Sequence, residues 1–229
     1  MSEALDNNRA ARDAVLARVR KALSKDGVDA QAQAKANADA YIAAHRQGPR
    51  PDMPADLRAR FIIRATDMSS TVESIATLAD VPAAVARYLD TLARAGGERL
   101  YSGVCWPEFA NLDWGAAQLA IEPRPAGGED RLGITGCFCA VAETGTILIT
   151  SGAATPTASA LLPDTHVAIV RAERIVSGLE EAFGHVRSEL GRMPRALNFI
   201  SGPSRTGDIE QTIVLGAHGP FRVHLLVVG

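Results

Sequence analysis

The sequence predicts an α/β protein built on a largely parallel sheet with flanking helices. Two short runs, 166–170 and 222–228, are almost continuously apolar, which is typical of strands buried on both faces. Residues 83–95 and 179–190 instead carry apolar side chains at helical spacing. Strands that alternate with helices in this way favour an α/β fold with a largely parallel sheet.

The first part of the chain is predicted to be helical, from residue 1 to residue 46. Leu16, Val19 and Leu23 recur at helical spacing, and 30–44 is rich in alanine. This apolar stripe is too thin to build a core, so we expect the segment to pack on the main domain or on a partner. Prolines between 48 and 54 resist helix. We therefore predict a helical extension with a proline-rich linker, 1–54, and an α/β domain, 55–229.

Within the α/β domain, helix and strand patterns follow one another. The helix at 83–95 begins after Asp80 and Pro82 and ends at Gly96. Another helix is expected near 57–62, and 209–215 fits either a helix or a strand. The predicted strands are 71–78, 99–104, 115–121, 133–141, 146–150, 166–170, 196–200 and 222–228.

Composition and charge narrow the class of function. Apolar residues make up 47% of the chain and charged residues 22%, as in ordinary soluble proteins. The net charge of -2 gives no general attraction to nucleic acid or to acidic membranes. No apolar run approaches the roughly 18 residues of a membrane span, and the N-terminus lacks an export pattern. We expect a cytoplasmic protein that has no nucleic-acid partner and no membrane span.

The cysteines indicate no cofactor and no metal site. The chain has three, Cys105, Cys137 and Cys139, which is too few for the four thiolates of an iron–sulfur cluster. No histidine or cysteine spacing typical of zinc is present. Alternate residues of a strand share a face, so we interpret Cys137 and Cys139 as buried structural thiols on one face.

The densest polar stretch of the chain is a candidate binding site. It combines hydroxyls, a cation, carboxylates and glycines: Ser201, Gly202, Ser204, Arg205, Thr206, Asp208 and Glu210. Glycines let backbone N–H groups approach an anion, so this composition suits a phosphate or carboxylate bound on a loop and a helix start. The alternative is a helix cap formed by Asp208 with Gln211. The segment follows strand 196–200, so we expect it at the carboxyl end of a parallel strand, where ligands collect.

A second turn and two histidines complete the candidates. Glu143, Thr144 and Gly145 lie between two strand-like runs, where a partly desolvated carboxylate can act as a base or nucleophile. Glu143 can equally pair with an arginine or accept turn N–H groups. His218 lies in a glycine-rich turn and His166 begins a strand, and each can be an acid–base group or a structural hydrogen-bonding group.

Taken in order, these motifs resemble the LUD-domain family in its LutC/YkgG branch. The resemblance covers roughly 60–229 and rests on Glu143-Thr-Gly, on Leu162-Pro with His166, on the run 201–210, and on Gly216-Ala-His-Gly-Pro. It implies the fold of glucosamine-6-phosphate deaminase, ribose-5-phosphate isomerase and the CoA transferases. It also implies a role in lactate utilization, the oxidation of L-lactate to pyruvate, beside iron–sulfur partner subunits.

Three functional hypotheses follow. The first is a subunit without an iron–sulfur cluster, which binds a small anion at loops 143–146, 201–210 and 216–220. The second is a stand-alone CoA-transferase-like enzyme in which Glu143 attacks an acyl-CoA. The third is a regulator that binds a phosphorylated metabolite through Arg205, Ser204 and Thr206. The residues alone leave open whether the chain is an enzyme and whether it forms a homo-oligomer.

Overall fold

The computed structural model describes residues 2–22, 28–209 and 212–229, and the chain divides into two units, Met1–Pro51 and Asp52–Gly229. The first unit contains helices α1 (Ser2–Ala22) and α2 (Val28–Ala43). None of the side chains described in this unit is buried, and Val15, Leu16 and Val19 are exposed on α1. The unit therefore has no hydrophobic core among its described residues.

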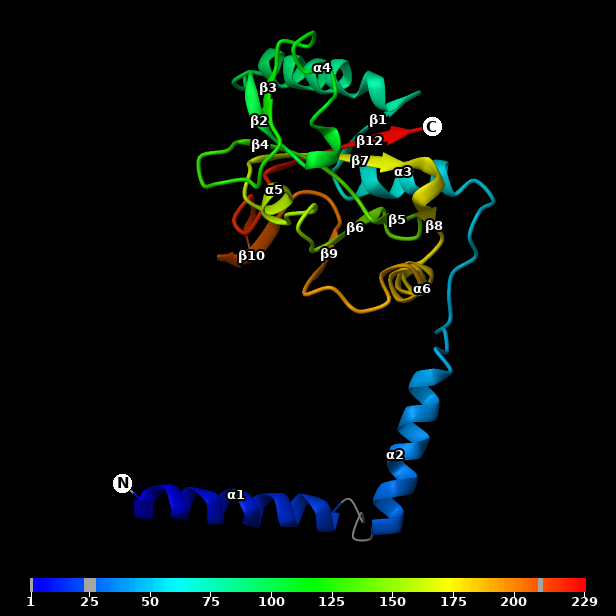
Figure 1. The fold of residues 1–229 in the computed structure, drawn as a ribbon, viewed down its shortest axis with the longest axis vertical. Coiled ribbons are helices and arrows are strands. Elements are labelled where there is room, and N and C mark those ends of the chain that lie inside the picture. Colours follow the sequence, from blue (N-terminus) through cyan, green and yellow to red (C-terminus); the bar gives the residue numbers. More distant parts are fainter. Residues whose placement is uncertain (1, 23–27, 210–211) are drawn as a thin grey trace. The chain divides into compact units, whose positions relative to one another are not determined.

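The second unit is built on a six-stranded parallel sheet with the strand order β1-β12-β7-β4-β2-β3 (Figure 1). β12 and β7, two of its central strands, are buried almost throughout, as expected for strands covered on both faces. The predicted α/β class with a largely parallel sheet is confirmed. The strands are β1 (Thr71–Ile75), β2 (Ser102–Cys105), β3 (Ala120–Glu122), β4 (Leu132–Gly136), β7 (Thr165–Arg171) and β12 (Arg222–Val228).

A second, mostly antiparallel sheet and a hairpin accompany the large sheet. The second sheet has the order β8-β5-β6-β9, and only β5 and β8 run parallel in it. The hairpin pairs β10 with β11 in antiparallel fashion. These strands are β5 (Cys139–Val141), β6 (Thr146–Thr150), β8 (Ile175–Val176), β9 (Leu197–Ile200), β10 (Arg205–Ile209) and β11 (Thr212–Leu215).

Helices cover the sheets on both sides. In Figure 1, α4 lies on one side of the large sheet, whereas α3, the second sheet and α6 lie on the other. The helices of this unit are α3 (Leu57–Asp67), α4 (Val81–Arg94), α5 (Ala158–Leu161) and α6 (Leu179–Leu190), with short 3-10 turns at Leu78–Asp80, Pro107–Phe109 and Ala172–Arg174.

Helix α4 positions the site described below. Its buried residues include Val81, Val85, Tyr88 and Leu89, which recur at helical spacing and therefore form one stripe facing the sheet. Asp80 immediately precedes α4, and its carboxylate accepts a hydrogen bond from the Thr77 N–H at 2.9 Å. Burial of this stripe fixes the rotation of α4 and sets Tyr88 against the sheet.

The predicted strand 133–141 is two strands in different sheets. β4 ends at Gly136 in the large sheet, and β5 begins at Cys139 in the second sheet. Cys139 therefore packs in a cluster with residues of α6, whereas Cys137 packs against the core of the large sheet. The expectation that the two thiols share one strand face is wrong. The predicted strand 115–121 is also mostly turn, since β3 starts only at Ala120.

The segment 201–210 differs most from expectation. β9, which precedes it, pairs antiparallel with β6 in the second sheet, so the segment does not leave a strand of the parallel sheet. From Arg205 the chain forms β10, so Asp208 lies in a strand and does not cap a helix. Of the two alternatives for 209–215, the strand is correct. Glu210 lies outside the described residues.

Candidate functional site

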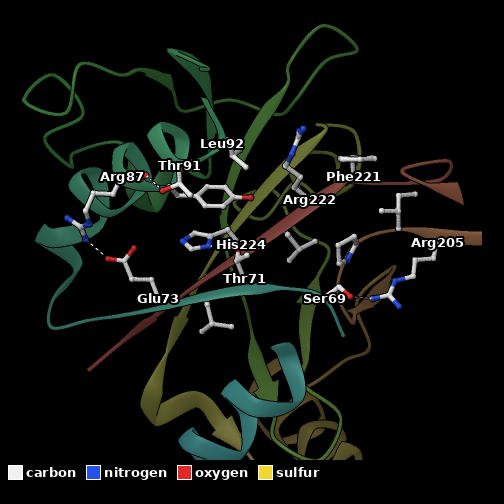
Figure 2. Close-up of a pocket in the computed structure, with 15 residues that line it drawn as sticks. Ser69, Thr71, Glu73, Arg87, Thr91, Leu92, Arg205, Phe221, Arg222 and His224 are labelled. Carbon is white, nitrogen blue, oxygen red and sulfur yellow. Dashed lines mark hydrogen bonds and ion pairs between the residues drawn. The ribbon is translucent and has the colours of Figure 1, made fainter. Parts of the chain in front are cut away.

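A pocket of about 930 Å³ lies between α4 and the starting residues of β1 and β12, and it is bordered by the base of the hairpin (Figure 2). Its polar lining residues are Ser69, Thr71, Glu73, Arg87, Tyr88, Thr91, Arg205, Arg222 and His224. Its apolar lining residues are Val72, Leu92, Pro203, Leu215, Phe221 and Val223. The volume falls within the range of pockets that enclose organic ligands. The pocket lies where β1 and β12 begin, not at the carboxyl ends of the sheet.

The strand pattern brings the polar residues of β1 and β12 together. Thr71 is directly opposite His224 in the parallel register. Alternate side chains of a strand point to the same face, so Arg222 and His224 share the face that α4 covers. Glu73, two residues after Thr71, reaches α4 on this face and forms an ion pair with Arg87.

A stacked pair of rings forms the floor of the pocket. The rings of Tyr88 and His224 are 4.0 Å apart between centroids and within 5° of parallel. His224 is 4% exposed, and its Nδ1 is 2.8 Å from the Thr71 hydroxyl oxygen. Its Nε2 is buried with no hydrogen-bond partner among the described residues.

Burial controls the ionisation of both rings. Desolvation lowers the pKa of His224 to about 4, although the negative charge of Glu73 acts in the opposite direction. Desolvation also raises the pKa of the Tyr88 phenol, while the Thr71 hydroxyl and the charge of Arg222 oppose that rise. Both rings are therefore uncharged near pH 7.

The charged side chains give the pocket an excess of positive charge. Three arginines line it against one carboxylate, that of Glu73, which is paired with Arg87. Arg205 Nη2 donates to the Met68 carbonyl and to the Ser69 hydroxyl, both at 2.6 Å. The Arg222 guanidinium lies 4.9 Å from the centre of the Phe221 ring. Within the described part of the chain, neither Arg205 nor Arg222 has a carboxylate partner, so this side of the pocket suits an anion.

Close backbone packing holds the hairpin base beside the pocket. Gly202 has a φ of +78°, and a Cβ there would lie 2.0 Å from the Met68 carbonyl oxygen. Ser204 donates its N–H to the Pro220 carbonyl and accepts the Gly216 N–H, both at 2.9 Å. Glycine at position 202 therefore allows the hairpin base to contact the turn after α3, where Arg205 finds its two acceptors.

The predicted turn at 143–145 is joined to the predicted segment 201–210 by hydroxyl groups. The Thr144 and Thr146 hydroxyl oxygens are 2.7 Å apart, and the Thr146 and Ser201 hydroxyl oxygens are 2.6 Å apart. Gly145 has a φ of +69°, and a Cβ there would lie 2.3 Å from the Ala65 nitrogen, so the turn packs tightly on α3. This chain of hydroxyls connects the two predicted loops directly.

The predicted site residues do not all lie in the pocket. Arg205 lines the pocket, whereas the N–H of Glu143 donates to the Ser177 carbonyl and the N–H of His218 donates to the Ser204 hydroxyl. Thr206 and Asp208 lie in β10. The residues that line the pocket do not include Glu143, Thr144, Gly145, Ser201, Gly202, Ser204, Thr206 or His218.

His166 is separate from the pocket. It is fully buried in β7, and its Nε2 is 2.8 Å from the Thr135 hydroxyl. Desolvation lowers the pKa of His166 to about 4. Its position indicates a structural role within the sheet.

Sequence reasoning missed Tyr88, His224 and Arg222. Arg222 and His224 alternate with valine and leucine at the start of an otherwise apolar strand. Two polar side chains on one face of a buried strand indicate a polar region at that face, and this pattern was available in the sequence. Tyr88 has no comparable signal, because it belongs to the apolar stripe of α4.

The described residues do not meet the requirements of a metal site or of a membrane-spanning helix. Among the described residues, no group of three or more His, Cys, Asp or Glu side chains is placed to hold a metal ion. Desolvation raises the pKa of the Cys105 and Cys139 thiols to about 11. Over the ranges that the structure describes, no helix combines the length and apolarity that crossing a membrane requires.

Comparison with known proteins shows that the chain is similar to LUD-domain proteins and to lactate utilization proteins. Residues 114–228 match the LUD domain. A lactate utilization protein C from Deinococcus radiodurans is 33% identical over 188 residues, which cover 79% of this chain and 84% of that protein. Proteins of the same name from Shouchella clausii and Bacillus subtilis are 37% and 34% identical over 99 and 100 residues, and the matched regions span 43% and 42% of those proteins.

A solved structure resembles the chain in three dimensions. The crystal structure of a DUF162 family protein from Deinococcus radiodurans matches with a TM-score of 0.53 and 25% sequence identity. The match covers 78% of this chain and 100% of the solved chain.

Proposed function

This chain belongs to the LUD-domain family, and we propose that it serves in lactate utilization as a subunit that binds an organic anion and carries no iron–sulfur cluster of its own. The lactate role is supported by the similarity to proteins named lactate utilization protein C. The anion would bind in the pocket between α4, β12 and the hairpin. Partner proteins with iron–sulfur clusters would accept the electrons of lactate oxidation.

The observation that carries the anion site is the pair Arg205 and Arg222. Both line the same pocket, and neither has a carboxylate partner among the described residues. A guanidinium group offers planar, bidentate hydrogen bonding to carboxylate or phosphate, and such bonds are stronger than those between neutral groups. A bound anion would complete the charge balance that Glu73 already provides for Arg87.

Electron transfer by partner proteins is supported by the cysteines. The chain has three, and burial raises the pKa of the Cys105 and Cys139 thiols. Because a cysteine binds cluster iron as a thiolate, a raised thiol pKa makes these side chains poorer ligands. This supports the proposal that partner proteins, and not this chain, hold the iron–sulfur clusters.

Helix α1 is our proposed contact for these partners. Val15, Leu16 and Val19 are exposed on one side of it.

The test is a pull-down from lactate-grown cells with the full-length chain and with a Val15→Asp, Val19→Asp variant. We expect the full-length chain to recover proteins with iron–sulfur absorption and the variant to lose them. Ala17→Asp, on the opposite face of α1, is the control and should recover them. Recovery of no iron–sulfur protein by the full-length chain would contradict the subunit arrangement.

A growth experiment tests the function and its anion site together. A strain that lacks the gene should grow on glucose and fail on L-lactate, and the wild-type gene should restore growth. Arg222→Gln should restore little growth, because it removes a charge that lines the pocket. Arg187→Gln, which changes an exposed arginine of α6, is the matched control and should restore full growth. Full restoration by Arg222→Gln at wild-type protein level would reject the anion site.

A further inference from the structure

We propose that the ligand of this pocket is a nucleoside phosphate, whose phosphate binds Arg205 and whose base stacks beside Arg222 and Phe221. This inference rests on the proposed anion site and names the chemical class that the site accepts. It is carried by the volume of the pocket, by an exposed apolar wall, and by the different surroundings of Arg205 and Arg222, which have no carboxylate partner among the described residues.

The volume is too large for a three-carbon acid alone. The pocket measures about 930 Å³, near the upper end of the range of roughly 300–1,000 Å³ typical of sites for larger organic ligands. Lactate or pyruvate would leave most of this space to water. A nucleotide would fill a much larger part of it.

One wall of the pocket exposes apolar surface to solvent. Phe221 and Leu215 are 43% and 41% exposed, although both are large and apolar. Figure 2 shows Phe221 on the same side of the pocket as Arg222 and Arg205, with Arg87 and Glu73 on the other side. Exposed apolar residues gathered beside cations indicate a ligand with both an apolar and an anionic part.

Arg222 and Phe221 together offer a surface for a planar ring. The guanidinium of Arg222 lies over the Phe221 ring at 4.9 Å from its centre. Gly216 allows this arrangement, since a Cβ at position 216 would lie 3.2 Å from Phe221. Bases stack on aromatic rings and on guanidinium planes, so this pair is suited to a nucleobase.

Arg205 is prepared for a phosphate. Its Nη2 makes the two hydrogen bonds to Met68 and Ser69 at 2.6 Å, which fix the direction of the guanidinium group. An arginine has five N–H donors, and hydrogen-bond partners among the described residues are seen only for Nη2, so Nε and Nη1 can donate to an anion. Tyr88 and His224, which form the floor of the pocket, are both uncharged near pH 7, so the floor adds no negative charge that would repel the phosphate.

Isothermal titration of the full-length chain tests this inference. The probes are AMP, ADP and FMN, with inorganic pyrophosphate and L-lactate for comparison. We expect saturable binding of at least one nucleotide, at least tenfold weaker binding in Phe221→Ala and Arg205→Gln, and at least tenfold weaker binding of pyrophosphate. AMP and ADP against FMN separate a purine base from a flavin ring.

The matched control uses a second cation–ring pair on another surface. Arg99 lies 4.4 Å from the centre of the Tyr101 ring, and Tyr101 is 59% exposed and outside the pocket. Tyr101→Ala should bind nucleotide like the wild type. Circular dichroism and thermal unfolding establish that each variant is folded, and Arg222→Gln replaces Phe221→Ala or Arg205→Gln if either is not.

The outcomes separate this inference from the proposed function. No saturable nucleotide binding by the wild type, or pyrophosphate binding as tight as that of the nucleotides, would overturn the inference. If Arg222→Gln also fails to restore growth on L-lactate, the proposed function stands without its nucleotide. Full growth with Arg222→Gln would instead reject the proposed site itself.

Discussion

The ring of Tyr88 lies flat against the ring of His224, with their centroids 4.0 Å apart and their planes 5° from parallel. Tyr88 belongs to α4 and His224 to β12, so the pair joins a helix in the first half of the sequence to the last strand. The Thr71 hydroxyl, 2.8 Å from His224 Nδ1, extends this contact to β1. The pocket floor therefore depends on residues that only the folded chain brings together.

Stability should fall in mild acid because His224 is buried in its neutral form. Its pKa is about 4 in the folded chain against an ordinary value of 6.5, so the unfolded chain binds a proton first as the pH falls. The free energy of unfolding is unaffected by this group above pH 6.5 and decreases between pH 6.5 and about 4, by on the order of 3 kcal/mol in total. His166 adds a decrease in the same direction. Urea unfolding at several pH values measures this decrease in the free energy of unfolding.

The variant His224→Phe isolates this contribution. Phenylalanine keeps a ring against Tyr88 but does not titrate, so the decrease in stability from pH 6.5 to 4 should be clearly smaller than in the wild type. His218→Gln, at an exposed position, is the control and should keep the wild-type slope. An unchanged slope in His224→Phe would show that the neutral state of His224 contributes little.

Gly202→Ala should be strongly destabilising. The new Cβ would lie 2.0 Å from the Met68 carbonyl oxygen, and the φ of +78° is itself unfavourable for alanine. We expect a loss of at least about 2 kcal/mol in the free energy of unfolding. Gly207→Ala, in the same hairpin, is the control: no described atom lies within 4 Å of its Cβ position, so it should change stability by less than about 0.5 kcal/mol. Equal effects would argue against the observed packing of the hairpin base.

Thr146→Val should lower stability by about 1–2 kcal/mol. Thr146 is 3% exposed, and its hydroxyl contacts both Thr144 and Ser201, so valine removes two hydrogen bonds while keeping the side-chain shape. Ser201→Ala should cost less, because Thr146 keeps its partner Thr144. A double-mutant cycle measured by urea unfolding should be non-additive. Additive effects would mean that the hydroxyl chain does not act as a unit.

The regular parts of the fold could be predicted because local patterns determine them. β7 and β12 are buried strands and carry almost continuous apolar sequence. The helix at 83–95 has an apolar stripe at helical spacing and corresponds to α4. In these segments, the burial pattern is a direct consequence of side-chain order, so composition and periodicity are sufficient.

The hairpin and the pocket could not be predicted in the same way. Glycines and a proline in 201–210 are typical of loops, and β10 exists only because β11 pairs with it. The break that separates β4 from β5 depends on two sheets packing together, which short-range patterns do not report. The pocket joins Thr71 and Tyr88 to His224, which lies 153 residues after Thr71 in the chain. Only the alternation of Arg222 and His224 on the last strand pointed toward it.

The central claim is that the pocket beside α4 carries the function, and obstructing it tests that claim most directly. Thr91 is exposed on α4 and lines the pocket, so Thr91→Trp should fill space there without disturbing the core. Arg94→Trp adds the same ring to the same helix outside the pocket lining. We predict that a gene-deletion strain carrying Thr91→Trp grows on glucose but fails on L-lactate, while Arg94→Trp restores growth on both. Wild-type growth on L-lactate with a folded, normally expressed Thr91→Trp protein would contradict the claim.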